Sequence, residues 1–195
     1  MKRSAKDERK TKETEVFVEL AVDGEGTYSV ETGIPFFNHM LELFAKHGLF
    51  DLTVRGKGDI DVDYHHLVED TGIVLGKVLR EALGDMKGIR RYGFAAVPMI
   101  DALAEVAVDV SNRPHLVFRC QVQTEKVGLF DTELVEEFLR AFSQSSGICI
   151  HVNVPYGSNS HHTIEAIFKA LARALDDATR LDERRKDLPT TKGVF

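Results

Sequence analysis

The chain contains 195 residues, of which 43% are hydrophobic and 29% charged, a composition typical of an ordinary globular protein that excludes wholesale disorder. Its 25 basic and 31 acidic side chains give a net charge of −6, which argues against a broad surface for nucleic acid or anionic membrane. No apolar run approaches the roughly 20 residues of a membrane span, and the first residues lack the apolar core of a signal peptide, so we expect a cytoplasmic protein.

The first half of the chain predicts strands and helices behind a polar start. Residues 1–13 carry six basic and three acidic side chains, which favours a polar N-terminal arm. Apolar residues alternate along 15–23, and the turn Asp23-Gly24-Glu25-Gly26 then predicts a β-hairpin with a second strand at 27–31. The remaining periodic segments predict a helix from Pro35 to about 46 with Gly48 as its C-cap, a strand at 50–55, and a helix at 65–83 ended by Gly84.

The second half repeats the later part of this order. Three strands are expected, at 94–100, 104–110 and 116–122. They are followed by a helix at 132–143, a strand at 148–154 and a helix at 160–176. The last three elements repeat the helix–strand–helix block of the first half.

Two copies of the motif His-His-x-x-Glu, abbreviated HHxxE, open equivalent helices. The first is His65-His66-Leu67-Val68-Glu69 and the second His161-His162-Thr163-Ile164-Glu165, 96 residues further on. Aligning the preceding helices matches Leu41 with Leu139 and Phe44 with Phe142 and places His39 opposite Glu137. The sequence therefore predicts an internal duplication.

The predicted fold class is α+β. We expect a single domain over 1–195 built from two similar halves, about 14–90 and 91–185, related by a pseudo-two-fold axis. Each half is predicted to be a small, mostly antiparallel sheet covered on one face by two helices. A C-terminal tail completes the chain.

The repeated motifs predict a dinuclear metal site. Neighbouring histidines on a helix point about 100° apart, which makes it awkward for both to bind one ion, whereas two ions could each take one histidine from each helix. The candidate ligands are the histidines and glutamates of both motifs together with the matched pair from the preceding helices: His39, His65, His66, Glu69, Glu137, His161, His162 and Glu165. The set contains no thiolate and suits Mn, Fe, Co, Ni or Zn.

Two further features carry charge that a substrate could use. Lys169 continues the helical stripe of His161 and Glu165, either as an ordinary ion pair with Glu165 or as an ammonium beside the metals. Basic residues (Arg90, Arg91, Arg113) and the tail Pro189-Thr190-Thr191-Lys192-Gly193 offer the hydroxyl and cationic groups that bind a phosphate monoester, although a solvated surface would have the same composition.

The sequence resembles the imidazoleglycerol-phosphate dehydratase family nearly from end to end, in the form without a fused phosphatase domain. The motifs that carry the resemblance are Thr11-Lys12-Glu13-Thr14, Asp23-Gly24-Glu25-Gly26, Pro35-Phe36-Phe37-Asn38-His39-Met40-Leu41, His65-His66-Leu67-Val68-Glu69-Asp70, Ser160-His161-His162-Thr163-Ile164-Glu165-Ala166 and Thr191-Lys192-Gly193. The resemblance implies a hydro-lyase of L-histidine biosynthesis that dehydrates D-erythro-imidazoleglycerol phosphate to imidazoleacetol phosphate.

The resemblance also implies the cofactor, the assembly and the roles of residues. Two Mn(II) ions are expected, one held by His39, His66, Glu69 and His162, the other by His65, Glu137, His161 and Glu165. Phosphate contacts carry over to Arg91, Arg113, Thr190, Thr191 and Lys192. A homo-oligomer of 24 subunits is implied, with active sites between subunits, no nucleic-acid partner and no membrane partner.

The chemistry of the expected reaction explains the use of two metals. If both ring nitrogens bind metal, the substrate imidazole becomes imidazolate-like and its electrons can expel the neighbouring hydroxyl. Glu13 is the expected base for the carbon-bound proton, with a metal-bound water or Lys169 assisting the departing hydroxyl. Many family members have His at position 137, where this chain has Glu, and the usual acidic pair is Ile100-Asp101 here.

Two other classes of protein would use similar residues. A dinuclear metallohydrolase would use the same ligands to form a bridging hydroxide. A non-catalytic metal-binding assembly protein would explain the histidines, but neither the phosphate-binding tail nor Glu13.

Overall fold

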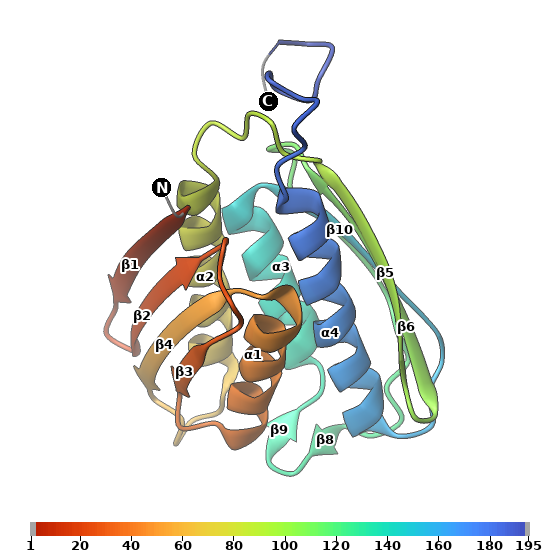
Figure 1. The fold of residues 1–195 in the computed structure, drawn as a ribbon. Coiled ribbons are helices and arrows are strands. Elements are labelled where there is room, and N and C mark those ends of the chain that lie inside the picture. Colours follow the sequence, from red (N-terminus) through yellow and green to blue (C-terminus); the bar gives the residue numbers. More distant parts are fainter. Residues whose placement is uncertain (1–2, 194–195) are drawn as a thin grey trace.

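The computed structural model describes residues 3–193, in which two four-stranded sheets enclose four helices (Figure 1). The first half consists of β1 (Ser4–Lys10), β2 (Thr14–Ala21), β3 (Tyr28–Glu31), α1 (Pro35–Gly48), β4 (Asp51–Gly58) and α2 (His65–Leu83). The second half consists of β5 (Tyr92–Met99), β6 (Ala102–Val110), β7 (His115–Arg119), β8 (Lys126–Val127), β9 (Phe130–Asp131), α3 (Leu134–Ser146), β10 (Ile148–Tyr156) and α4 (Ser160–Thr179).

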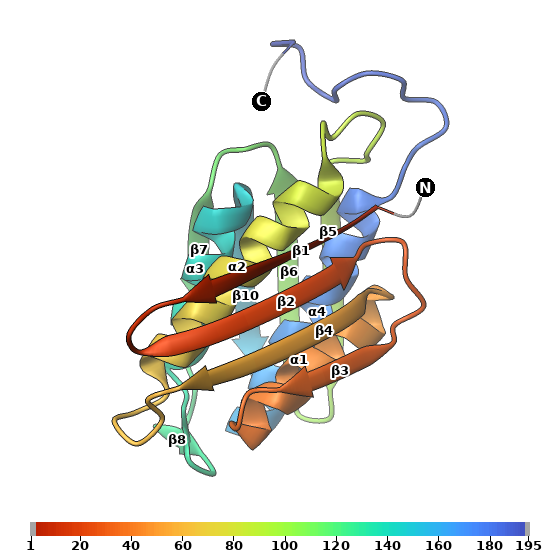
Figure 2. The same cartoon turned by 90° about the vertical axis from the view of Figure 1, so that its left-hand side faces the viewer.

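The two large sheets have the same topology, which confirms the predicted α+β fold of two similar halves. Their strand orders are β1-β2-β4-β3 and β5-β6-β10-β7, and in each sheet the last pair is parallel and the others are antiparallel. Figure 2 shows the first sheet face-on, with the helices behind it. The main helix contacts, α2 with α3 and α4 with α1, are exchanged when the two halves are exchanged, as a pseudo-two-fold relation requires.

Matching hydrogen bonds fix which residues of the two halves correspond. The amide of Val22 donates to the carbonyl of Arg3 at 2.9 Å, and the amide of Val110 donates to the carbonyl of Arg91 at 3.0 Å. A two-residue turn then joins the first two strands of each half, Lys12-Glu13 in one and Ile100-Asp101 in the other. Glu13 and Asp101 therefore occupy equivalent positions.

A single hydrophobic core fills the space between the sheets. Alternate residues of β2 (Val16, Val18 and Leu20) are fully buried, and the helices add a cluster of phenylalanines: Phe37, Phe44, Phe138, Phe142 and Phe168. Burying apolar surface on one face of each helix and sheet is the main stabilising contribution to such a layered fold. The common core explains why neither half needs to fold alone.

The N-terminal residues form a strand, so the expectation of a solvated arm was wrong for residues 4–10. β1 pairs with β2 along its full length from Ser4–Ala21 to Lys10–Glu15. Its side chains alternate between exposed and half-buried because successive residues of a strand point to opposite faces, and its edge position tolerates the charged residues that resembled an arm.

The expected hairpin between 15–23 and 27–31 was also wrong. β4 lies between β2 and β3, and β3 pairs with β4 in parallel. The Asp51 carboxylate at the start of β4 accepts hydrogen bonds from the amides of Glu25 and Thr27 and from the Thr27 hydroxyl. These bonds hold the glycine-rich connection against the start of β4.

Helix α1 ends differently from the prediction, whereas α2 spans the predicted residues. Gly48 belongs to α1, and Leu49 adopts the left-handed C-cap conformation with φ of 56°. Gly48 is needed because an added Cβ would lie 2.4 Å from the ring of Phe50. Among residues 3–193, no helix is long and apolar enough to cross a bilayer.

Candidate metal and phosphate sites

The N-terminus of α4 brings three potential metal ligands together. The Asn159 side chain caps the helix by accepting a hydrogen bond from the His162 amide. One turn apart, His161 Nε2 lies 3.2 Å from Glu165 Oε2, and His39 of α1 places its Nε2 3.6 Å from the same oxygen. The donor atoms of His39, His161 and Glu165 all lie within 4.8 Å of one another, which is close enough for them to share an ion.

Glu165 is the buried centre of this group. Its side chain is only 8% exposed, and Lys169 Nζ lies 2.5 Å from Oε1. Burial would raise the pKa of Glu165, but the hydrogen bond and charge of Lys169, with smaller contributions from His39 and His161, outweigh burial and lower it. Glu165 is therefore held as a carboxylate, the form that binds a cation. Lys169 forms the expected ion pair and also lies beside the candidate ligands.

An apolar pocket adjoins the three ligands. Its volume is about 440 Å³, and its lining includes Phe36, Phe130 and Leu129 along with His39 and His161. The ring of Phe36 lies 5.2 Å from the rings of both Phe130 and His161. These contacts restrict the orientation of the His161 ring.

The N-terminus of α2 carries the first HHxxE motif in a looser arrangement. Asp63 accepts a hydrogen bond from the His65 amide at 2.7 Å, which supports the start of the helix. His65 Nε2 lies 3.9 Å from Glu69 Oε2, and both side chains are more than a third exposed. The pair therefore faces solvent in a single chain.

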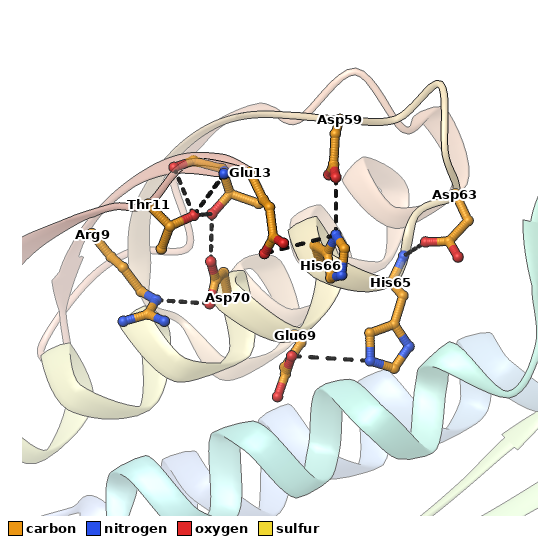
Figure 3. A network of polar contacts seen from close by, with 10 residues as sticks. Arg9, Thr11, Glu13, Asp59, Asp63, His65, His66, Glu69 and Asp70 are labelled. Atoms are coloured by element: carbon orange, nitrogen blue, oxygen red, sulfur yellow. Dashed lines mark hydrogen bonds and ion pairs between the residues drawn. The ribbon is translucent and has the colours of Figure 1, made fainter.

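His66 points away from His65 and Glu69, toward two carboxylates (Figure 3). Its Nδ1 lies 3.0 Å from Asp59 Oδ2 and 4.0 Å from Glu13 Oε2. The hydrogen bond with Asp59, with added charge from Glu13 and Asp59, raises the pKa of His66 despite partial desolvation. Glu13, the expected base, thus lies beside a candidate ligand.

The turn that carries Glu13 is anchored to α2 (Figure 3). The Thr11 hydroxyl accepts hydrogen bonds from the amides of Glu13 and Thr14 at 3.0 and 2.9 Å. Asp70 of α2 binds the Thr14 hydroxyl through one oxygen and Arg9 through the other, at 2.7 Å from Arg9 Nε. Asp70 is buried, so this network fixes the turn relative to the HHxxE helix.

His162, the second histidine of the other motif, contacts Asp101. Its Nδ1 forms a short contact with Asp101 Oδ1. Hydrogen bonds from Ser158, then from His162 and from the amides of Ser158 and Asn159, hold the pKa of Asp101 well below its ordinary value. The β5–β6 turn is thereby tied to the start of α4.

Glu137 lies outside the group formed by His39, His161 and Glu165. Its carboxylate is 3.9 Å from Arg140 Nε. The expected ligand sets assign His39 and Glu165 to different ions, yet these side chains are in contact within one chain. The division of the eight ligands between two ions stays a prediction.

The expected phosphate contacts meet at another place. A cavity of about 700 Å³ is lined by Arg91, Tyr92, Ser111, Arg113, Pro189, Thr190, Thr191 and Lys192. Arg91 is buried, and its Nη1 donates to the Pro189 carbonyl at 2.7 Å, which attaches the tail to the cavity. Cationic and hydroxyl groups around such a cavity suit a phosphate.

Asp109 holds both arginines of the cavity. It accepts from Arg91 at 2.7 and 3.2 Å and from Arg113 at 3.2 Å. Burial would raise the pKa of Asp109, but hydrogen bonds from Arg91 and Ser111 and the arginine charges lower it. The carboxylate fixes the arginines without neutralising their combined charge.

The histidines and the phosphate cavity lie at opposite ends of α4. His161 is in the first turn, whereas the Arg91 amide donates to the carbonyl of Ala178 near the last turn. These positions are 17 residues apart, or about 25 Å at 1.5 Å per residue. Figure 1 shows the same separation, with the tail at one end of the molecule and the start of α4 at the other.

The sequence did not indicate the contacts of three aspartates at these sites. Asp59 and Asp101 contact histidine rings, and Asp109 supports the arginines. Asp59 and Asp101 do not occupy equivalent positions in the two halves, so the duplication does not indicate that they have the same role. The alternation of β6 does place Asp109 on the face opposite the core, but the pattern does not indicate its partners.

Comparisons with known proteins identify similar chains. A family model described as imidazoleglycerol-phosphate dehydratase matches residues 32–175. The chain is 58% identical over 193 residues to the imidazoleglycerol-phosphate dehydratase of Bacillus pumilus (strain SAFR-032) and 59% to that of Halalkalibacterium halodurans; both matches cover 99% of this chain and 100% of the relative.

Solved structures show the same similarity. The crystal structure of imidazoleglycerol-phosphate dehydratase from Staphylococcus aureus subsp. aureus N315 matches with a TM-score of 0.84 and 41% identity, covering 92% of this chain and 99% of that chain. The enzyme from Pyrococcus furiosus, solved in complex with (S)-C348, matches with a TM-score of 0.84 and 35% identity, covering 97% and 100%.

Proposed function

Because the chain belongs to the imidazoleglycerol-phosphate dehydratase family, whose members are hydro-lyases of histidine biosynthesis, we propose that it dehydrates D-erythro-imidazoleglycerol phosphate with two Mn(II) ions held by its repeated HHxxE motifs. The observation that carries the metal proposal is the convergence of His39, His161 and Glu165 from two helices. The product is imidazoleacetol phosphate.

The donor set fits Mn(II). The three donors are two imidazole nitrogens and one ionised carboxylate oxygen, and the five remaining candidates are also nitrogen or oxygen donors. Glu165 is kept ionised by Lys169, so it needs no deprotonation to bind a cation. When bound, the metal pair supplies Lewis acidity to the ring nitrogens of the substrate.

The side chains of this protein provide binding and proton transfer. The cavity around Arg91, Arg113 and Lys192 binds the substrate phosphate and orients the chain that carries it. Glu13, on a turn anchored to α2, accepts the carbon-bound proton. Lys169 holds a proton on Nζ, 2.5 Å from Glu165, and assists departure of the hydroxyl.

The distance between the two sites supports an active centre made by more than one chain. In the substrate, three carbons separate the ring from the phosphate oxygen, a span below about 8 Å at bond lengths of about 1.5 Å. The histidines and the phosphate cavity of one chain are about 25 Å apart along α4. The ring and phosphate of one substrate are therefore bound by different subunits.

Exposed apolar side chains support self-association. Phe94 is 62% exposed on β5, Ile100 is 82% exposed in the β5–β6 turn, and Leu129 is 77% exposed beside the apolar pocket. Contact with another chain at these places would remove this apolar surface from water. We propose the 24-subunit homo-oligomer that the family resemblance implies.

The test uses the assembled protein. Chelator-stripped protein is assayed for turnover of imidazoleglycerol phosphate with and without added Mn(II), while bound metal is counted by elemental analysis and particle mass is measured by light scattering. We expect activity only with metal, two ions per chain and a 24-subunit mass. Full activity without metal, or an assembled and metal-loaded protein without activity, would contradict the proposal.

A further inference from the structure

Each HHxxE motif has one histidine whose Nδ1 faces a carboxylate. Asp59 Oδ2 lies 3.0 Å from Nδ1 of His66, and Asp101 Oδ1 forms a short contact with Nδ1 of His162. A carboxylate only accepts hydrogen bonds, so Nδ1 carries the hydrogen in both contacts. The lone pair of each ring is then on Nε2.

The two carboxylates reach these rings from different places in the fold. Asp101 lies in the β5–β6 turn at the position equivalent to Glu13, whereas Asp59 follows β4 and is seven residues before His66. The same contact with the second histidine thus arises from unrelated positions. Simple inheritance through the duplication does not explain this, because the repeat counterpart of Asp101 is Glu13.

We propose that Asp59 and Asp101 are positioning residues that fix the ring orientation and tautomer of His66 and His162, leaving Nε2 of each ring as the nitrogen for metal. The inference rests on the proposed metal site. Carboxylates hydrogen-bonded to metal-binding histidines fix the ring and raise its basicity, and losing one lowers metal affinity by roughly 10 to 100-fold.

The two halves divide this task differently. In the second half the turn carboxylate, Asp101, contacts the histidine itself and also accepts hydrogen bonds from Ser158 and from the Asn159 amide at 2.8 Å. In the first half Asp59 takes the histidine contact, and the equivalent turn carboxylate, Glu13, stays 4.0 Å away from Nδ1 and 57% exposed. Asp59 thereby leaves Glu13 available to act on a substrate.

Backbone hydrogen bonds hold Asp59 in place. Its amide donates to the Glu13 carbonyl at 3.1 Å, and its carbonyl accepts from the Val62 amide at 2.8 Å. The main chain on both sides of the Asp59 side chain is therefore fixed. A carboxylate held in this way restricts a neighbouring ring more than one on a loose loop would.

The test measures Mn(II) affinity in the full-length, assembled protein by competition with a chelator. We expect Asp59→Ala and Asp101→Ala each to weaken binding about 10 to 100-fold, and Asp59→Asn and Asp101→Asn, which keep a carbonyl acceptor, to weaken it less. Asp61→Asn removes an exposed charge from the same loop and should leave affinity unchanged.

A spectroscopic measurement reports the tautomer independently of metal and activity. Nitrogen-15 solid-state NMR of histidine-labelled, metal-free protein should show Nδ1-protonated rings for His66 and His162, and each signal should change in the corresponding alanine variant. Unchanged affinity and tautomer in both alanine variants would overturn this inference while leaving the proposed function intact. Failure of wild-type protein to bind Mn(II) would overturn both.

Discussion

Arg91 and Asp109 form a two-point ion pair, with Nε at 2.7 Å from Oδ1 and Nη2 at 3.2 Å from Oδ2. The Arg91 side chain is 10% exposed and that of Asp109 is 21% exposed, so both charges are largely removed from water. The pair links the residue before β5 to β6, and Nη1 of Arg91 holds the C-terminal tail through Pro189. The ion pair therefore connects the stability of the sheet with the phosphate cavity.

Replacing Asp109 by Asn should make the free energy of unfolding depend less on pH in the acidic range. The lowered pKa of Asp109 means that its charge stabilises the folded state above the ordinary aspartate pKa of about 4, and that this contribution is lost as the pH falls through the lowered value. Asp109→Asn should cost about 2 kcal/mol at neutral pH, less than a fully buried pair. Thermal unfolding of both proteins between about pH 3 and pH 7 checks this, and a difference that does not shrink in acid would contradict it.

Glu13→Gln should abolish most of the activity without affecting assembly. The amide cannot accept the proton, and removal of a general base typically lowers turnover by about 10² to 10⁴-fold. Turnover, bound Mn(II) and particle mass should be measured together, with Glu15→Gln as the control because Glu15 pairs with Lys10 on the neighbouring strand. Wild-type turnover in Glu13→Gln would exclude Glu13 as the base.

Glu137→Ala should lower the number of bound Mn(II) ions per chain. Glu137 is the repeat counterpart of His39, which lies in the group of three potential ligands. Glu136→Ala is the matched control, because Glu136 is the neighbouring residue and pairs with Arg140 at 2.5 Å. Elemental analysis should find about two ions per chain in the control and fewer in Glu137→Ala. Equal stoichiometry would remove Glu137 from the ligand set.

Gly72→Ala should destabilise the protein although alanine favours helices. An added Cβ would lie 2.7 Å from the Phe138 carbonyl and 3.1 Å from the Ala141 Cβ, where α2 crosses α3. This steric overlap outweighs the preference of alanine for helices, which is up to about 1 kcal/mol. We therefore expect the free energy of unfolding to fall by about 1 to 3 kcal/mol. Thermal unfolding measures the change, and Lys77→Ala, at an exposed position of α2, serves as a control expected to be near neutral. A higher unfolding temperature for Gly72→Ala would contradict this prediction, because it would mean that α2 and α3 move apart at little cost.

Most of the fold could be predicted because apolar periodicity is strong where elements are buried. The helix at 65–83 was predicted from the spacing of its apolar residues and agrees with α2. The charged edge strand β1 lacks such a pattern, since only one face is half-buried. The position of β4 between β2 and β3 depends on long-range pairing that the local Asp-Gly-Glu-Gly turn does not indicate.

Some residues of the candidate site could also be predicted from sequence patterns, and others could not. Repetition of HHxxE predicted the candidate ligands His161 and Glu165, which the structure brings together with His39. Asp59 and Asp101 were missed because their role depends on which ring each carboxylate faces, and that is decided by the turns after β4 and β5. The sequence does not show which histidine ring a turn carboxylate faces, so both aspartates resemble ordinary surface acids there.

The length of α4 has a genetic consequence. If each active centre takes its histidines from one subunit and its phosphate cavity from another, each chain contributes to at least two centres. A defect in the histidines of a chain then inactivates one of these centres, and a defect in its phosphate cavity inactivates the other. Chains carrying Glu165→Gln and chains carrying Arg113→Ala would each be inactive alone. Co-expressed in one cell, they would form mixed particles in which some centres receive both intact halves, so two defective alleles would complement each other.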